Sequence, residues 1–133
     1  VAPMNLTEPS DEIAFVDTGF WADRAIEAAS NEANAFYLAS SKDTNHDRIP
    51  KITDVQGARY LHVVSNETID GTQYHDFPEV DVPLVADMTS DFLSKPLDVD
   101  RFGIIFASAQ KNFGIAGITS DCGRDFVIQK SHR

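Results

Sequence analysis

The chain has a single cysteine, Cys122, so it cannot form an internal disulfide or a metal site built from several thiolates. A reducing compartment is the natural default for such a sequence, and we expect a cytoplasmic protein. No apolar run approaches the roughly 20 residues of a membrane span, so we expect no membrane partner. The first residues show neither the basic nor the apolar segment that directs secretion.

Basic residues are also few. The 11 lysines and arginines stand against 21 aspartates and glutamates, which gives a formal net charge of −10. An acidic surface repels phosphate backbones and anionic lipids, so we expect no nucleic acid partner. The four histidines show no ligand spacing with one another or with Cys122, and we expect no metal. Glycine patterns of nucleotide-binding loops are missing as well.

Short apolar runs do recur along the chain, separated by helical or polar segments. This alternation is typical of an α/β sheet. We expect a loop over residues 1–12, a helix over about 21–33 and a weak helical turn over 51–58. Beyond Gly117 we expect a returning strand and then a helix near Arg124. The expected strands before that point are 13–17, 35–39, 59–65, 82–87 and 103–107.

The segment Ser108–Gly117 follows the apolar run Phe102–Ala107 and contains Lys111. An unprotonated ε-amine is a good nucleophile toward carbonyls, so Lys111 is a candidate to bind an aldehyde cofactor. Gly114 and Gly117 would let the backbone approach a bulky ligand closely. The alternative is an ordinary solvated lysine in a loop.

Four other residues are candidates to contact the same ligand. Asp87 ends an apolar run and can pair with a protonated ring nitrogen, or it can cap the turn that follows. Trp21 can stack on a flat ring or anchor its helix. Thr68 can donate to a ring hydroxyl or satisfy a local turn. Gln110 can contact the cofactor from beside Lys111 or face solvent.

These candidates follow different strands of the expected sheet. In open α/β sheets a ligand sits beyond the carboxyl ends of the strands. Trp21, Thr68, Asp87 and Lys111 come after the first, third, fourth and fifth expected strands. We therefore expect them at one edge of the sheet.

Four sequence blocks follow one another along the chain: FVDTGFW (Phe15–Trp21), SNETIDG (Ser65–Gly71), VADMTSDFLSKP (Val85–Pro96) and AQKNFG (Ala109–Gly114). These blocks and their order resemble the phosphoserine aminotransferase family. That family consists of fold-type I enzymes that depend on pyridoxal 5'-phosphate. The resemblance implies a mostly parallel sheet, part of a large domain.

The resemblance implies a role for each candidate. Lys111 matches the lysine that binds the cofactor covalently and then moves a proton, and Asp87 matches the partner of the pyridine nitrogen. Trp21 matches the residue stacked on the ring, Thr68 the donor to the ring oxygen, and Gln110 a contact on the phosphate side. The implied reaction moves an amino group between glutamate and 3-phosphohydroxypyruvate and yields phosphoserine for serine biosynthesis, in a homodimer.

Some features depart from the family pattern. We expect residues 1–133 to be a partial large domain, without the family's N-terminal segment, its small C-terminal domain or its substrate-binding arginines. Ile115 stands where the family usually has proline, and Asp121 and Gly123 are poor residues for a central strand. The alternative hypothesis is a truncated or decayed fragment that binds the cofactor without catalysis. A desulfurase-like relative would have histidine where Gln110 stands.

Overall fold

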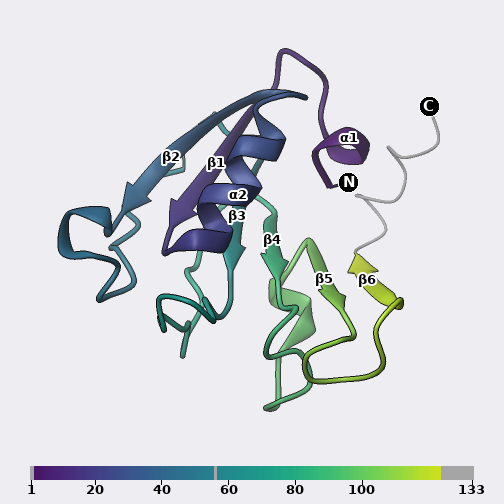
Figure 1. The fold of residues 1–133 in the computed structure, drawn as a ribbon. Helices are drawn as coiled ribbons and strands as arrows, with labels where there is room; N and C mark the ends of the chain where they lie inside the picture. Colours follow the sequence, from purple (N-terminus) through teal and green to yellow (C-terminus); the bar gives the residue numbers. More distant parts are fainter. Residues whose placement is uncertain (1, 56, 124–133) are drawn as a thin grey trace.

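A six-stranded sheet in the order β2-β1-β3-β4-β5-β6 organises the chain (Figure 1). The structure is a computed structural model that describes residues 2–55 and 57–123. Strands β1 to β5 are parallel, and β6 is antiparallel to β5. The expected α/β sheet is confirmed. The strands are β1 (Glu12–Asp17), β2 (Asn34–Ser40), β3 (Tyr60–Val64), β4 (Leu84–Asp87), β5 (Ile104–Ser108) and β6 (Thr119–Gly123).

The helices are short, and α2 (Phe20–Ala29) is the longest that the structure describes. It ends four residues before the predicted end, because the chain turns after Ser30 to enter β2. The predicted loop at the start is wrong in part, since residues Ala2–Leu6 form α1 and pack Ala2 and Leu6 onto the sheet. Two 3-10 helices, Lys42–Thr44 and Val99–Arg101, lie in connections.

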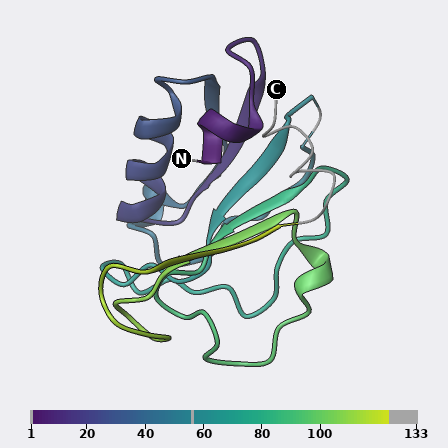
Figure 2. The ribbon, with the colours of Figure 1, turned by 90° about the vertical axis from the view of Figure 1, so that its right-hand side faces the viewer.

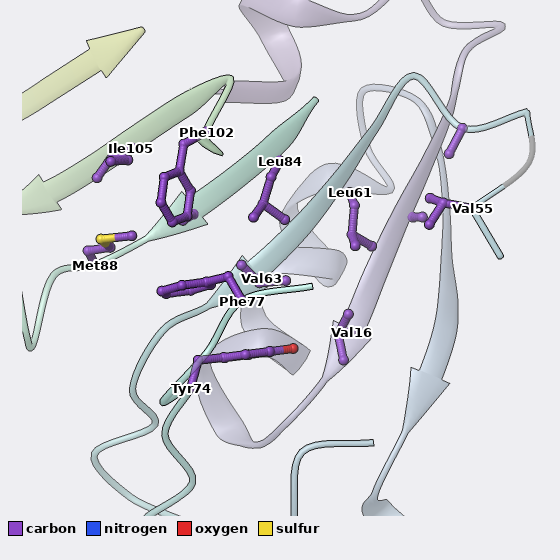
Figure 3. Close-up of a cluster of buried hydrophobic side chains, with 13 residues drawn as sticks. Val16, Val55, Leu61, Val63, Tyr74, Phe77, Leu84, Met88, Phe102 and Ile105 are labelled. Carbon is purple, nitrogen blue, oxygen red and sulfur yellow. The ribbon is translucent and has the colours of Figure 1, made fainter. Parts of the chain in front are cut away.

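The sheet is covered on both faces, with α1 and α2 on one side and long connections on the other (Figure 2). Alternation along each strand sends successive side chains to opposite faces. Beneath α2, Phe15 and Val85 pack with Ile26 and Ala29 of the helix. The other face carries a larger cluster that includes Leu61, Val63, Tyr74, Phe77 and Ile105 (Figure 3).

The chain makes its topological switch at β1. From β1 it passes through α2 to β2 on one side, and it then returns to β3 on the other side. The connection that leaves the carboxyl end of β1 therefore leads toward β2, and the one that leaves β3 leads away from it toward β4. This is where open parallel sheets form a ligand crevice.

Two predictions about connections need comment. The weak helical turn predicted for 51–58 is wrong for the residues described there, because this segment runs without helix and sends Val55 and Ala58 into the core. The returning strand after Gly117 is confirmed as β6, an exposed edge strand. The helix predicted near Arg124 lies outside the described residues.

Candidate functional site

The connections that follow β1 and β3 bring Trp21 and Thr68 into direct contact. Trp21 is the second residue of α2, and Thr68 lies in the connection after β3. The indole Nε1–H of Trp21 donates a hydrogen bond of 3.2 Å to Thr68 Oγ1. The Trp21 side chain remains 44% exposed, so its ring is open to a ligand at this edge of the sheet.

The same connection fastens the first turn of α2. Glu67 is fully buried, and its two carboxylate oxygens accept from the backbone N–H of Trp21 at 2.9 Å and of Ala22 at 2.8 Å. Asp70 Oδ2 accepts from the backbone N–H of Phe20 at 2.7 Å. The first N–H groups of a helix have no partner within the helix, and this loop supplies acceptors for three of them.

Asp87 closes β4 on the α2 face of the sheet. Its register partners are Val64 on β3 and Phe106 on β5, so two apolar side chains flank it. Burial raises the pKa of Asp87, and hydrogen bonds from Thr89 lower it in part. Among the residues that the structure describes, none forms an ion pair with this carboxylate.

The turn-capping alternative for Asp87 is therefore also present in the structure. Asp87 Oδ1 accepts from the backbone N–H of Thr89 at 2.9 Å, and Thr89 Oγ1 accepts from the backbone N–H of Ser108 at 3.3 Å. One oxygen of the Asp87 carboxylate caps the turn at Thr89. Thr89 then holds the end of β5 through Ser108. The two interpretations of Asp87 are compatible.

Gln110 and Lys111 follow β5 and are exposed. The backbone beside them is held, because Asn112 Nδ2 donates to the Phe92 carbonyl at 2.7 Å and the rings of Phe92 and Phe113 pack edge to face. The loop after β5 is thus attached to the loop that follows Asp87, the last residue of β4. Lys111 itself extends from this anchored loop into solvent.

The chemistry of these side chains fits a pyridoxal-type aldehyde. Asp87 is a half-buried carboxylate without a cationic partner in the described chain, and a protonated pyridine nitrogen is a cation of suitable shape. Trp21 offers an exposed aromatic face, and Thr68 offers a hydroxyl whose acceptor position is already used. Lys111 offers a solvent-accessible amine at the neighbouring strand end.

Sequence reasoning assigned no role to Glu67, although the residue lies inside one of the four blocks. Its signal was weak, because a glutamate in a polar loop is usually solvated. Only the fold shows that the loop folds back over α2 and buries this carboxylate. The same holds for Asn112, whose partner lies 20 residues earlier.

Elsewhere, a cavity of about 560 Å³ is lined by residues from 49–55, by Gly57 and by residues from 74–82. None of the five candidate residues lines it. Within residues 2–55 and 57–123, no group of three metal-ligating side chains comes together. No helix in that part of the chain is long and apolar enough to cross a membrane.

Comparison with known proteins identifies a family that the chain matches. The model of the family described as aminotransferase class-V matches residues 1–133. A phosphoserine aminotransferase of Lysinibacillus sphaericus is 39% identical over 137 residues, which cover all of this chain and 38% of that protein. The chain thus spans less than two fifths of the length of this relative.

Solved structures give the same picture. The phosphoserine aminotransferase from Bacillus circulans subsp. alkalophilus superposes with a TM-score of 0.90 at 40% identity, over 96% of this chain and 36% of that one. A phosphoserine aminotransferase from Trichomonas vaginalis, solved with pyridoxal phosphate bound, gives a TM-score of 0.84 at 31% identity, over 96% and 40%. These superpositions confirm the expected fold class, an incomplete, mostly parallel sheet of a fold-type I large domain.

Proposed function

Because the chain belongs to the class-V aminotransferase family, we propose that it is the cofactor-binding part of a phosphoserine aminotransferase. The enzyme transfers an amino group between glutamate and 3-phosphohydroxypyruvate and yields phosphoserine, a step of serine biosynthesis. Support comes from relatives that carry this name at 39% and 40% identity. Since the chain spans about 38% of the first relative's length, substrate specificity is part of the proposal.

The cofactor of the proposal is pyridoxal 5'-phosphate, which supplies an aldehyde that takes up the amino group and a protonated ring that withdraws electrons from the substrate Cα. Lys111 would hold the aldehyde through its ε-amine and, once free, would supply the base for the proton at the substrate Cα. The Asp87 carboxylate would pair with the protonated pyridine nitrogen. Trp21 would stack on the ring.

Thr68 and Gln110 complete the proposed set. Thr68 Oγ1 accepts the indole N–H of Trp21, so its own hydroxyl hydrogen is available for the ring oxygen. Gln110, next to Lys111, contacts the phosphate side. The observation that supports the proposal is that Trp21, Thr68, Asp87 and Lys111 follow β1, β3, β4 and β5 at the carboxyl edge of one parallel sheet.

The proposed partner is a second copy of the chain, and the proposed location is the cytoplasm. Large apolar side chains are exposed in the loops at the carboxyl edge, namely Ile69 at 61%, Leu93 at 70% and Ile115 at 74%. Exposed apolar side chains in neighbouring loops favour contact with another protein surface. A homodimer whose active sites lie at the interface would cover them.

The test begins with binding of the cofactor. Pyridoxal 5'-phosphate added to the protein should produce the absorbance band of a protonated imine, and Lys111→Ala should abolish the band. Lys51→Ala, which removes another exposed lysine, should keep it. Adding glutamate should then bleach the band, and 3-phosphohydroxypyruvate should restore it. Absence of a Lys111-dependent band would overturn the proposal.

A second candidate is a chain that binds the cofactor without turnover, and the exposed strand β6, which contains Asp121 and Gly123, is the observation that favours it. It predicts the same Lys111-dependent band. It differs in that glutamate leaves the band unchanged. The two candidates are therefore separated by the response to glutamate alone.

A further inference from the structure

Glu67 is a carboxylate buried where no cation pairs with it. It is fully inaccessible to solvent, and no salt bridge in the described chain includes it. Burial raises its pKa, and the two backbone hydrogen bonds to α2 lower it in part. Burying a carboxyl group costs free energy unless hydrogen bonds or an opposite charge compensate for the lost water. For Glu67 this compensation comes from the hydrogen bonds to α2.

Those hydrogen bonds replace a cap that α2 lacks. Gly19, at the N-cap position, has no side chain to accept from the first turn. Glu67 reaches this turn from 46 residues away, and both of its oxygens are used. The acceptors come from the connection after β3, so α2 is fixed relative to the other side of the switch point.

The residue after Glu67 is Thr68, and both act on Trp21. The backbone N–H of Trp21 binds Glu67, while its indole N–H binds Thr68. Trp21 is thus held at its backbone and at its ring by two consecutive residues. A shift of Glu67 would move the Trp21 backbone and the Thr68 hydroxyl relative to each other.

We propose that Glu67 is a positioning residue that sets the Trp21 ring and the Thr68 hydroxyl in the mutual orientation that the cofactor requires. The inference rests on the proposed function, since it assigns Trp21 and Thr68 to the same ligand. Glu67 touches neither cofactor nor substrate and acts through these two neighbours.

The substitution Glu67→Gln tests this with little change in shape. It replaces one acceptor oxygen by an NH₂ group that faces a backbone N–H, so one of the two bonds is lost. Asp70→Ala is the matched control, because it removes the acceptor that caps the same turn through the Phe20 N–H, and Asp70 has no bond to Trp21. A purely structural capping role would make the two variants behave alike.

Two readouts are needed. In the cofactor-free protein, the indole N–H resonance of Trp21, assigned with Trp21→Phe, should shift and exchange faster with solvent in Glu67→Gln and stay in place in Asp70→Ala. In titrations with pyridoxal 5'-phosphate, Glu67→Gln should weaken binding about tenfold and reduce the circular dichroism of the bound chromophore. Asp70→Ala should change affinity less than twofold.

An unchanged indole resonance, or an altered one with wild-type affinity and dichroism, would overturn the inference while the proposed function stands. Equal effects of the two variants would also overturn it, in favour of capping. A wild-type protein without a Lys111-dependent band would overturn the proposed function and the inference together. If Glu67→Gln does not fold, Glu67→Asp, which keeps the charge but is one methylene shorter, is expected to move the same resonance.

Discussion

The indole of Trp21 and the hydroxyl of Thr68 form a hydrogen bond of 3.2 Å across 47 residues of sequence. An indole N–H can only donate, so Thr68 Oγ1 must accept. The hydroxyl hydrogen is then directed away from Trp21 and is available to another acceptor. The bond therefore fixes the Trp21 ring, which can stack on a ligand, next to the Thr68 hydroxyl, which can donate to it.

Replacing Thr68 by valine should weaken cofactor binding. Valine has the shape of threonine, but it offers no donor and leaves the Trp21 N–H without its acceptor. One hydrogen bond is worth about 1 kcal/mol, so we expect roughly a fivefold rise in the cofactor dissociation constant. The constant is measured by titrating the Lys111-dependent absorbance. Thr68→Ser, which keeps the hydroxyl, should remain within about threefold of wild type, and equal affinities for the valine and serine variants would contradict the assignment.

Asp87→Asn should stabilise the cofactor-free protein and weaken cofactor binding. Burial raises the pKa of Asp87, so ionising it in the folded state lowers stability as pH rises from 3.8 through the folded pKa. Asparagine removes that loss and can still accept from the Thr89 N–H. We expect a gain of roughly 1 kcal/mol at pH 7 by urea unfolding, and none well below pH 3.8.

The same substitution removes the charge proposed to hold the proton of the pyridine nitrogen. Cofactor affinity should fall more than tenfold. An exposed acidic residue, changed in Asp54→Asn, serves as the control and should alter neither quantity. A variant that binds the cofactor as well as wild type would remove Asp87 from the site, whatever its stability.

The sequence was informative where a pattern is local. Short apolar runs separated by polar or helical segments predicted the first five strands. Parallel strands that are buried on both faces consist of nearly continuous apolar residues. The candidates at strand ends followed from the same runs, and the four blocks supplied their implied roles. The end of α2 and the short helix α1 were missed, because tertiary packing rather than periodicity decides such boundaries.

The positioning contacts could not be predicted in this way. Glu67 reaches α2, and Asn112 reaches the Phe92 carbonyl, only because the sheet order places their loops together. Nothing in a polar loop sequence reveals which side chain will be buried by a distant helix.

His62 should make the stability depend on pH in the acidic range. Its ring stacks on Phe15 at 4.7 Å between centroids and lies 6.0 Å from Phe106, and burial lowers its pKa to about 4. The unfolded chain takes up a proton near pH 6.5, whereas the folded protein does not do so until pH 4. Stability should therefore fall by about 3 kcal/mol as pH decreases through this window.

Urea unfolding at several pH values measures this dependence. His62→Phe keeps an aromatic ring between its neighbours and removes the titrating group, so its curve should lack this component. His75 is exposed, so the substitution His75→Asn should leave the pH dependence of stability as in the wild type. Parallel curves for wild type and His62→Phe would show that His62 is not held neutral in the folded protein.

A side chain at Gly19 should lower stability, because Gly19 lies close to the carboxyl groups of Glu67 and Asp70, which cap α2. Its φ is +152°, and a Cβ would lie 2.9 Å from Asp70 Cγ and 3.0 Å from Glu67 Cδ. Gly71 has φ +87° and open space around it, so Gly71→Ala carries backbone strain alone. We expect urea unfolding to give a loss of about 1 kcal/mol for Gly71→Ala and about 2–3 kcal/mol for Gly19→Ala. Because Gly19→Ala also displaces Glu67, it should weaken cofactor binding at temperatures where it remains folded, whereas Gly71→Ala should not. Equal losses of stability in the two variants would mean that the loop after β3 yields without strain and does not hold α2 in place.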